Sequence, residues 1–178
     1  VKFRDAYDLG QLIDTRERRQ ILGDFFFSPM DMVLQRTFPD TIVIARSNFD
    51  THGYIIHPLF MIRPPHREDI EVRVPWRCLL PRGLDGVIVT GLGVSAHRDA
   101  LPCIRMQPDV QNQGYAAGVA AAWISKKGCT TRQLDIKELQ KHLVAVGKLP
   151  ESILRETDNF PLPKEQVAEA VRRVAYDY

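Results

Sequence analysis

The chain contains 178 residues, 44% of them hydrophobic and 26% charged, which is enough apolar material for one domain with a buried core. With 24 basic and 22 acidic residues the net charge is only +2, so we expect neither nucleic acid nor an anionic membrane surface as a partner. No apolar run approaches the roughly 20 residues of a membrane helix, and the compartment stays open.

The N-terminal half is predicted to contain one helix and short strands. Ser28 followed by proline is typical of a helix N-cap and first helical position, and we expect this helix to stop at Pro39. The β-branched residues 41–45 predict a strand, and a second extended stretch follows over residues 50–57. Residues 71–74 alternate polar and apolar side chains, as a half-exposed strand does.

The C-terminal half is predicted to be mainly helical after one further strand. The apolar run 87–89 between two glycines is typical of a strand buried on both faces. An alanine-rich helix is expected over residues 111–126. Another is expected over residues 136–146, because Asp135 forms a capping-box-like start and Gly147 stands where a C′ glycine belongs.

Small residues gather along one side of the alanine-rich helix. Gly114, Gly118 and Ala122 follow at intervals of four, so they line one face. Each interior glycine costs roughly 1 kcal/mol against alanine. A face without side chains suits close approach of a strand or of a flat ligand, and tight packing with no ligand explains it equally well.

Gly91 and Gly93 precede this helix. With Ala96 they mimic the G-x-G-x-x-G/A dinucleotide fingerprint after an apolar strand. The context argues against a phosphate loop, because Pro102 lies within the helix that should follow and the second strand with its acidic residue is missing.

Several segments together resemble a known family. Taken in chain order, these segments resemble the C-terminal signature of the FAD-dependent oxidoreductase family. They are residues 74–81 (VPWRCLLP), 86–91, 95–100, 104–106 and 113–121 (QGYAAGVAA). The similarity extends over roughly residues 10–147. Bacterial members of that family often occur in polysaccharide-related contexts, so the resemblance implies a small-molecule substrate of carbohydrate-related chemistry.

The resemblance implies a two-part FAD fold, in which an N-terminal βαβ unit holds the ADP portion. The C-terminal strand and helix then return to the isoalloxazine. Gly91 and Gly93 would lie beside the cofactor, and the helix start at Gln113 and Gly114 would face the pyrimidine ring. The N-terminal glycine-rich segment has no counterpart, so we expect a fragment completed by a missing N-terminal segment of the same protein. Asp109 departs from the family pattern, as does the lack of a basic residue after Gly91, and a carboxylate near a flavin anion would weaken binding.

Candidate catalytic residues are His97, Asp50 and His52. Asp50 and His52 would share a face of an extended strand, where the carboxylate could orient the imidazole for proton transfer, although a solvated pair explains the spacing equally well. Adding His57 suggests a metal site, but the spacing is not that of a recognisable set, so no metal is expected.

Two arginines are candidate substrate ligands. Arg105 and Arg77 could bind a carboxylate in bidentate fashion, and a structural tie between loops is the alternative, favoured for Arg77. The three cysteines form no C-x-x-C pair, so neither a disulfide framework nor a zinc ribbon is indicated.

The predicted fold class is α/β or α+β. We expect part of a substrate domain over residues 1–74, the strand–helix portion of an FAD-binding domain over 75–128, a helical extension over 129–147, and a linker with a tail helix over 148–178. The predicted function is hydride transfer from an organic substrate to FAD by the complete protein, with this fragment inactive alone. The alternatives are a non-catalytic protein-interaction module, or a metal-dependent hydrolase built on Asp50, His52 and His57.

Overall fold

The computed structural model describes residues 19–51, 55–62 and 70–174. Its elements surround one hydrophobic core and combine helices with a small sheet, so the fold is of mixed α and β type, as predicted. The elements, in chain order, are α1 (Pro29–Val33), β1 (Thr41–Ala45), α2 (Pro58–Ile62), β2 (Val72–Pro75), the 3-10 helices η1 (Trp76–Leu79), η2 (Gly91–Gly93) and η3 (Leu101–Cys103), the helices α3 (Gln107–Lys127) and α4 (Ile136–Ala145), the 3-10 helix η4 (Glu151–Arg155), and α5 (Lys164–Val174).

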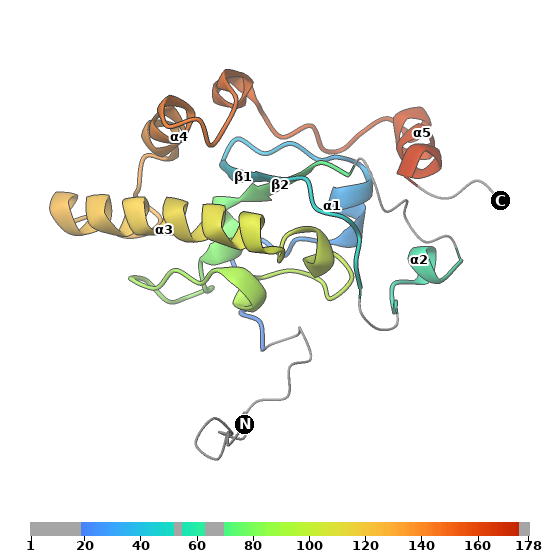
Figure 1. Ribbon diagram of the computed structural model, residues 1–178, viewed down its shortest axis with the longest axis horizontal. Coiled ribbons are helices and arrows are strands. Elements are labelled where there is room, and N and C mark those ends of the chain that lie inside the picture. Colours follow the sequence, from blue (N-terminus) through green and yellow to red (C-terminus); the bar gives the residue numbers. More distant parts are fainter. Residues whose placement is uncertain (1–18, 52–54, 63–69, 175–178) are drawn as a thin grey trace, which may run out of the picture.

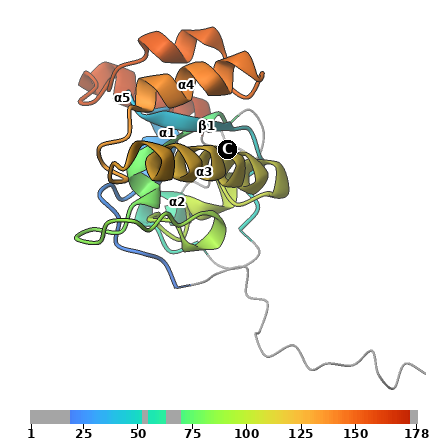
Figure 2. The same cartoon turned by 90° about the vertical axis from the view of Figure 1, so that its left-hand side faces the viewer.

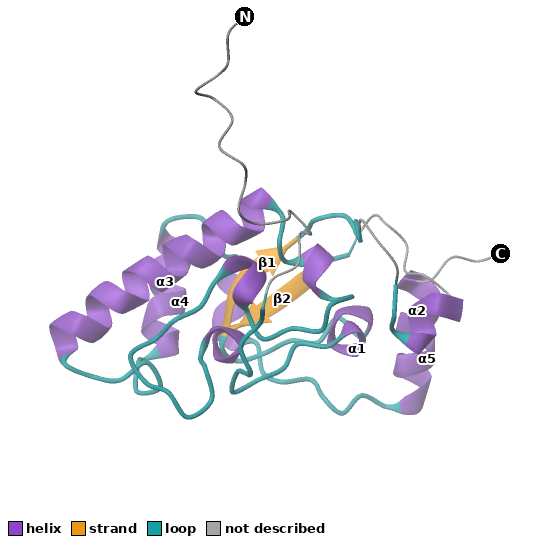
Figure 3. Ribbon diagram, turned by 90° about the horizontal axis from the view of Figure 1, so that it is seen from below, coloured by secondary structure: helices purple, strands orange, loops and turns teal. Residues whose placement is uncertain are grey.

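The sheet in the described part of the chain consists of β1 and β2. They pair antiparallel, with Thr41 opposite Pro75 and Ala45 opposite Val72, and the register shifts between Thr41 and Val43. Both strands were predicted. In β2 the side chains of Val72 and Val74 are buried whereas Arg73 is half-buried, which is the alternation that the sequence indicated. Figure 3 shows the two strands at the centre of the protein, surrounded by helices and loops.

Helices cover the sheet on two sides. In Figures 1 and 2, α4 and the C-terminal segment lie on one side of the strands and α3 lies on the other. The α4 helix begins at its predicted cap, where the Asp135 side chain accepts the Glu138 N–H at 3.1 Å, and Gly147 has the positive φ of +73° expected at its end. Gln140 of α4 is buried and donates to the backbone oxygen of Thr41 at 2.8 Å. None of the described helices is both long and apolar enough to cross a membrane.

The first helix is shorter than predicted. Ser28 is its N-cap, as the sequence indicated, and it forms a capping box with Asp31. The helix nevertheless ends at Val33 and does not continue to Pro39. Gln35 has a φ of +49°, which breaks the helical path, and Arg36 then folds back to form an ion pair with Asp31.

The predicted strand at residues 87–90 does not form, and this expectation is wrong. A strand buried on both faces needs neighbouring strands and covering elements. The described residues supply no pairing strand; Val89 donates one hydrogen bond of 2.9 Å to the carbonyl of Leu79, which lies in a 3-10 helix. The apolar side chains therefore remain partly uncovered, and Val87 is 38% exposed.

The proline-punctuated segment after α4 packs against the body of the protein. Leu149 and Ile153 are buried in the common core. Glu156 accepts two hydrogen bonds from Arg73 of β2, at 2.7 and 2.8 Å, and Asp158 forms an ion pair with Arg36. The predicted helix from Lys164 is confirmed as α5. The proposed division into domains stays a prediction.

Candidate functional site

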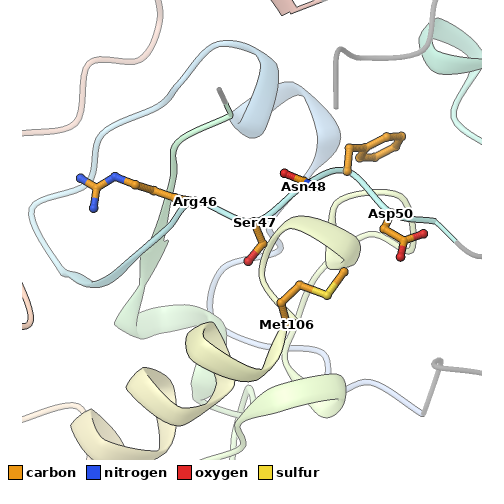
Figure 4. Close-up of a pocket in the computed structure, with 6 residues that line it drawn as sticks. Arg46, Ser47, Asn48, Asp50 and Met106 are labelled. Atoms are coloured by element: carbon orange, nitrogen blue, oxygen red, sulfur yellow. The ribbon is translucent and has the colours of Figure 1, made fainter. Parts of the chain in front are cut away.

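A cavity lies where the chain leaves β1 and where it enters α3. Its volume is about 520 Å³. Figure 4 shows the loop after β1 passing over Met106, the residue before α3. The lining residues are Arg46, Ser47, Asn48, Phe49, Asp50 and Met106. The fold therefore joins one predicted site residue, Asp50, to the N-terminal end of the longest helix.

The buried carboxyl group of Asp109 lies in the first turn of α3, directly behind this cavity wall. Its side chain is only 4% exposed and accepts a hydrogen bond of 2.5 Å from the Ser47 hydroxyl. Burial raises the pKa of Asp109 above its usual range, and the bond from Ser47 opposes that change. The carboxyl group thus keeps its proton to higher pH than an exposed aspartate, which reduces the negative charge that the sequence led us to expect beside a flavin.

Arg105 and Asp50 lie together at the same end of α3. The Arg105 Nη2 donates to the backbone oxygen of Asp50 at 2.7 Å, so this arginine anchors the loop that lines the cavity. Arg77 lies elsewhere, where its Nε and Nη2 donate to the carboxylate of Asp40 at 2.9 and 3.0 Å. That bidentate pair, together with the bond from the Arg77 N–H to the same carboxylate, ties η1 to the start of β1, the structural role favoured from the sequence.

Gln113 connects α3 to the turn at Gly91. Its side-chain oxygen accepts the Gly91 N–H at 3.0 Å and its side-chain nitrogen donates to the Ile104 carbonyl at 2.7 Å. Gln113 is fully buried and lies in the second turn, because α3 begins at Gln107, with proline in its first turn. The expectation that the helix starts at Gln113 and Gly114 is therefore wrong.

The glycines before α3 belong to a tight 3-10 turn. Gly91 has a φ of +67°, a conformation that favours glycine. At Gly93 an added Cβ would lie 2.9 Å from the Val89 Cγ1, so the chain passes too close for a larger residue without a shift. The Gly93 carbonyl accepts a hydrogen bond of 2.9 Å from the Ile21 N–H. A positive φ thus accounts for Gly91, and close packing within the protein accounts for Gly93.

The small-residue face of α3 is uncovered. Gly114, Gly118 and Ala122 are all exposed, and an added Cβ at either glycine would meet no described atom within 4 Å. The opposite face of the helix is buried, through Asp109 and Gln113 among others. The expectation of a strand pressed against these glycines is not met by the described residues, and the glycine face is open.

His97 lies in a separate cluster with His57 and Asp99. The His97 Nδ1 accepts the Asp99 N–H at 3.0 Å, and the two imidazole rings lie edge to face with their centroids 5.6 Å apart. The buried Asp99 carboxylate accepts two further backbone N–H groups, from Ile56 at 2.8 Å and His57 at 2.6 Å. Burial lowers the pKa of His97, with His57 contributing in the same direction and Asp99 opposing it. Sequence reasoning missed Asp99, although it stands only two residues after His97.

Not all the predicted residues come together. Neither histidine of this cluster lines the cavity beside Asp50. His52 lies outside the described residues, so its pairing with Asp50 stays a prediction. Among the residues that the structure describes, no group of three or more His, Cys, Asp or Glu side chains could hold a metal ion. The described cysteines Cys78, Cys103 and Cys129 are unbridged, and burial raises the pKa of Cys103 to about 12.

The comparisons with known proteins point to one family. A family model described as FAD dependent oxidoreductase matches residues 2–143, which include β1, β2, α3, most of α4 and the turn at Gly91. No curated protein and no solved structure matches the chain. Because the family model covers most of the sequence, the chain belongs to the FAD-dependent oxidoreductase family.

Proposed function

We propose that this chain forms the flavin-facing part of an oxidoreductase that transfers hydride from an organic substrate to FAD. Family membership supports the flavin-dependent class. The observation that carries the finer proposal is the open face at Gly114 and Gly118, on the helix whose opposite, buried face contacts the Gly91 turn through Gln113. A helix that pays for two interior glycines without filling the space above them has room for a flat group or a closely packed segment.

The residues present fit the flavin end of the cofactor. The uncovered glycine face leaves space for a ring system. The backbone of Gly91 lies next to the second turn of α3, because its N–H donates to the Gln113 side chain. Burial raises the pKa of Asp109, which is the direction that reduces its negative charge at a given pH. When bound, FAD would accept the hydride; the protein supplies orientation and electrostatic environment.

The side chains divide into two proposed roles. The first group would shape the surface toward the flavin and consists of Gly91, Gly93, Gln113 and Gly114. Gly91 and Gly93 do so by backbone, and Gln113 does so by holding the turn in place. Asp50 and Arg105 would serve the substrate, because the loop that Arg105 anchors lines the cavity of about 520 Å³. We propose a small-molecule substrate of carbohydrate-related chemistry there, and a separate polar contact from His97 to a part of the substrate outside this cavity.

A complementary segment would complete the cofactor site. The apolar residues around Val87 and Leu84 are partly uncovered, with exposed fractions of 38% and 52%. We propose that the segment that holds the ADP portion of FAD, from the same protein, covers this surface and supplies the missing pairing for residues 87–90.

The test is flavin retention, measured by visible absorption after desalting. The 178-residue chain and the same chain extended to its natural start are each incubated with FAD. We expect flavin bands to persist in the extended form and to be absent or weak in the shorter one. If neither form retains flavin, the open apolar surface favours the alternative of a non-catalytic module that binds a partner protein.

A further inference from the structure

The imidazole of His97 is held in one protonation state by its own chain. Its Nδ1 accepts the Asp99 N–H at 3.0 Å, and an atom that accepts a backbone hydrogen bond does not carry a proton itself. A neutral ring in this arrangement has its proton on Nε2. Adding a second proton at Nδ1 would break the bond to Asp99 and leave two N–H groups facing each other.

Asp99 is itself fixed by a long-range contact. One oxygen of its carboxylate, Oδ2, accepts both the Ile56 N–H at 2.8 Å and the His57 N–H at 2.6 Å, across more than 40 residues of sequence. The side chain is only 2% exposed. These bonds hold the segment before α2 against the loop that carries His97, and they fix the backbone of residue 99 that donates to the ring.

The surroundings of His97 disfavour a charged ring. His57 lies edge to face with it at 5.6 Å, and Phe26 packs against it at 6.4 Å. The Nδ1 of His57 is buried without a hydrogen-bond partner among the described residues, and the proximity of His57 lowers the pKa of His97. Of the charged groups around the ring, Arg98 lowers the pKa of His97 and Asp99 raises it, but burial dominates and the pKa is lowered.

We propose that His97 acts as a neutral hydrogen-bond donor through its Nε2–H, and that Asp99 is the positioning residue whose backbone N–H holds the ring in this tautomer. The proposal gives a specific role to His97, which the sequence indicated only as a candidate catalytic residue. It rests on the proposed function for its chemical use: a neutral N–H donor polarises an oxygen of the organic substrate without taking a proton from it.

The test is the ring tautomer of His97, measured by long-range 1H–15N correlation spectra of the 15N-labelled protein between about pH 5 and pH 8, across the ordinary titration range of histidine. The His97 signals are assigned by their loss in His97→Gln. At neutral pH we expect one tautomer, protonated at Nε2 and unprotonated at Nδ1. A ring protonated at Nδ1, or a fully charged ring at pH 7, would overturn the proposal.

Asp99→Asn and Asp99→Ala form a matched pair for the positioning role. An asparagine oxygen can accept the same two N–H groups, because the wild-type carboxylate uses a single oxygen for both. We expect the asparagine variant to keep the Nε2–H tautomer and the alanine variant to give a mixture of tautomers. If Asp99→Ala folds and keeps the pure tautomer, Asp99 has no positioning role; if it does not fold, the wild-type and asparagine spectra still decide the donor assignment.

Two variants should move the His97 titration in opposite directions. Asp99→Asn removes the negative charge that raises the pKa of His97, so its midpoint should fall, whereas His57→Gln removes a neighbour that lowers it, so its midpoint should rise. If these contacts had a merely structural role, the His97 titration midpoint would not shift in opposite directions. The same midpoint in wild type and both variants would count against the proposal. The spectra need no flavin, so failure of FAD retention would leave this result standing.

Discussion

Gln113 and Gly91 are joined by a hydrogen bond of 3.0 Å that links the second turn of α3 to the loop before it. The same glutamine donates to the Ile104 carbonyl at 2.7 Å, so one buried amide satisfies a donor and an acceptor on either side of η3. This contact places the Gly91 turn beside the helix that carries the open glycine face.

Replacing Gln113 with alanine should lower the free energy of unfolding by about 2–4 kcal/mol, because the substitution leaves the Gly91 N–H and the Ile104 carbonyl buried and unpaired. Urea denaturation of the purified chain measures the change. Gln111→Ala is the control, since Gln111 is exposed on the same helix and its loss should change stability by less than about 0.5 kcal/mol. Equal effects at the two positions would show that the buried amide does not hold the turn.

The open face of α3 can be tested by substitutions that separate stability from association. Gly114→Ala should raise the free energy of unfolding by about 0.5–1 kcal/mol, because the added Cβ meets no neighbour and alanine favours the helix. Thermal or urea denaturation measures this gain. A loss of stability would mean that the face is covered within the chain itself.

Gly118→Leu tests whether the same face is buried in the flavin-loaded protein. In the extended form we expect this variant to reduce retained flavin at least tenfold, because a large side chain would fill the space proposed for the cofactor or its covering segment. The matched control is Lys141→Leu, an equally exposed helical position on α4. Unchanged flavin content in Gly118→Leu would remove the glycine face from the cofactor site.

Asp109 should make stability depend on pH in an unusual direction. Its folded-state pKa is raised by burial, so the folded state holds the proton more tightly than the unfolded chain, and stability falls as pH rises from the unfolded pKa of about 3.9 through the raised folded value. Asp109→Asn removes this penalty, and an amide oxygen can still accept the Ser47 hydroxyl. Its advantage over wild type should therefore grow with pH, as measured by urea denaturation at several pH values.

Ser47→Ala provides the opposite perturbation at the same site. The hydroxyl group lowers the pKa of Asp109 by favouring the charged carboxylate, so its removal should reduce stability at neutral pH more than at acidic pH. A pH-independent difference between each variant and wild type would contradict the assigned burial effect.

Ile153 tests whether the segment after α4 belongs to the folded body. Its side chain is fully buried, so Ile153→Ala should lower the free energy of unfolding by about 2–4 kcal/mol. The neighbouring exposed Ser152→Ala should be nearly neutral. Urea denaturation with both variants compares them directly, and a neutral Ile153→Ala would show that this segment is an independent appendage.

Local signals determined much of the helical structure. The Ser28 cap, the Asp135 cap and Gly147 were read correctly because a helix end is satisfied by groups within a few residues of it. The long helix α3 was also predicted, although it begins at Gln107 because proline is accepted in its first turn. The family could be identified from ordered motifs for the same reason: each motif is contiguous in the sequence.

Tertiary structure decided what those elements contact. Residues 87–90 have the composition of a buried strand, but strand formation depends on a pairing neighbour that the described residues do not supply. Gln113 was expected at the helix start but lies in the second turn of α3, where it is buried because the turn at Gly91 folds back onto it. The Asp99 carboxylate meets the His57 N–H across 42 residues, and no local periodicity encodes such a contact. Sequence by itself therefore determined the family and the helices with their caps. The packing of distant segments decided which side chains form the candidate site, because only the folded chain brings their partners close.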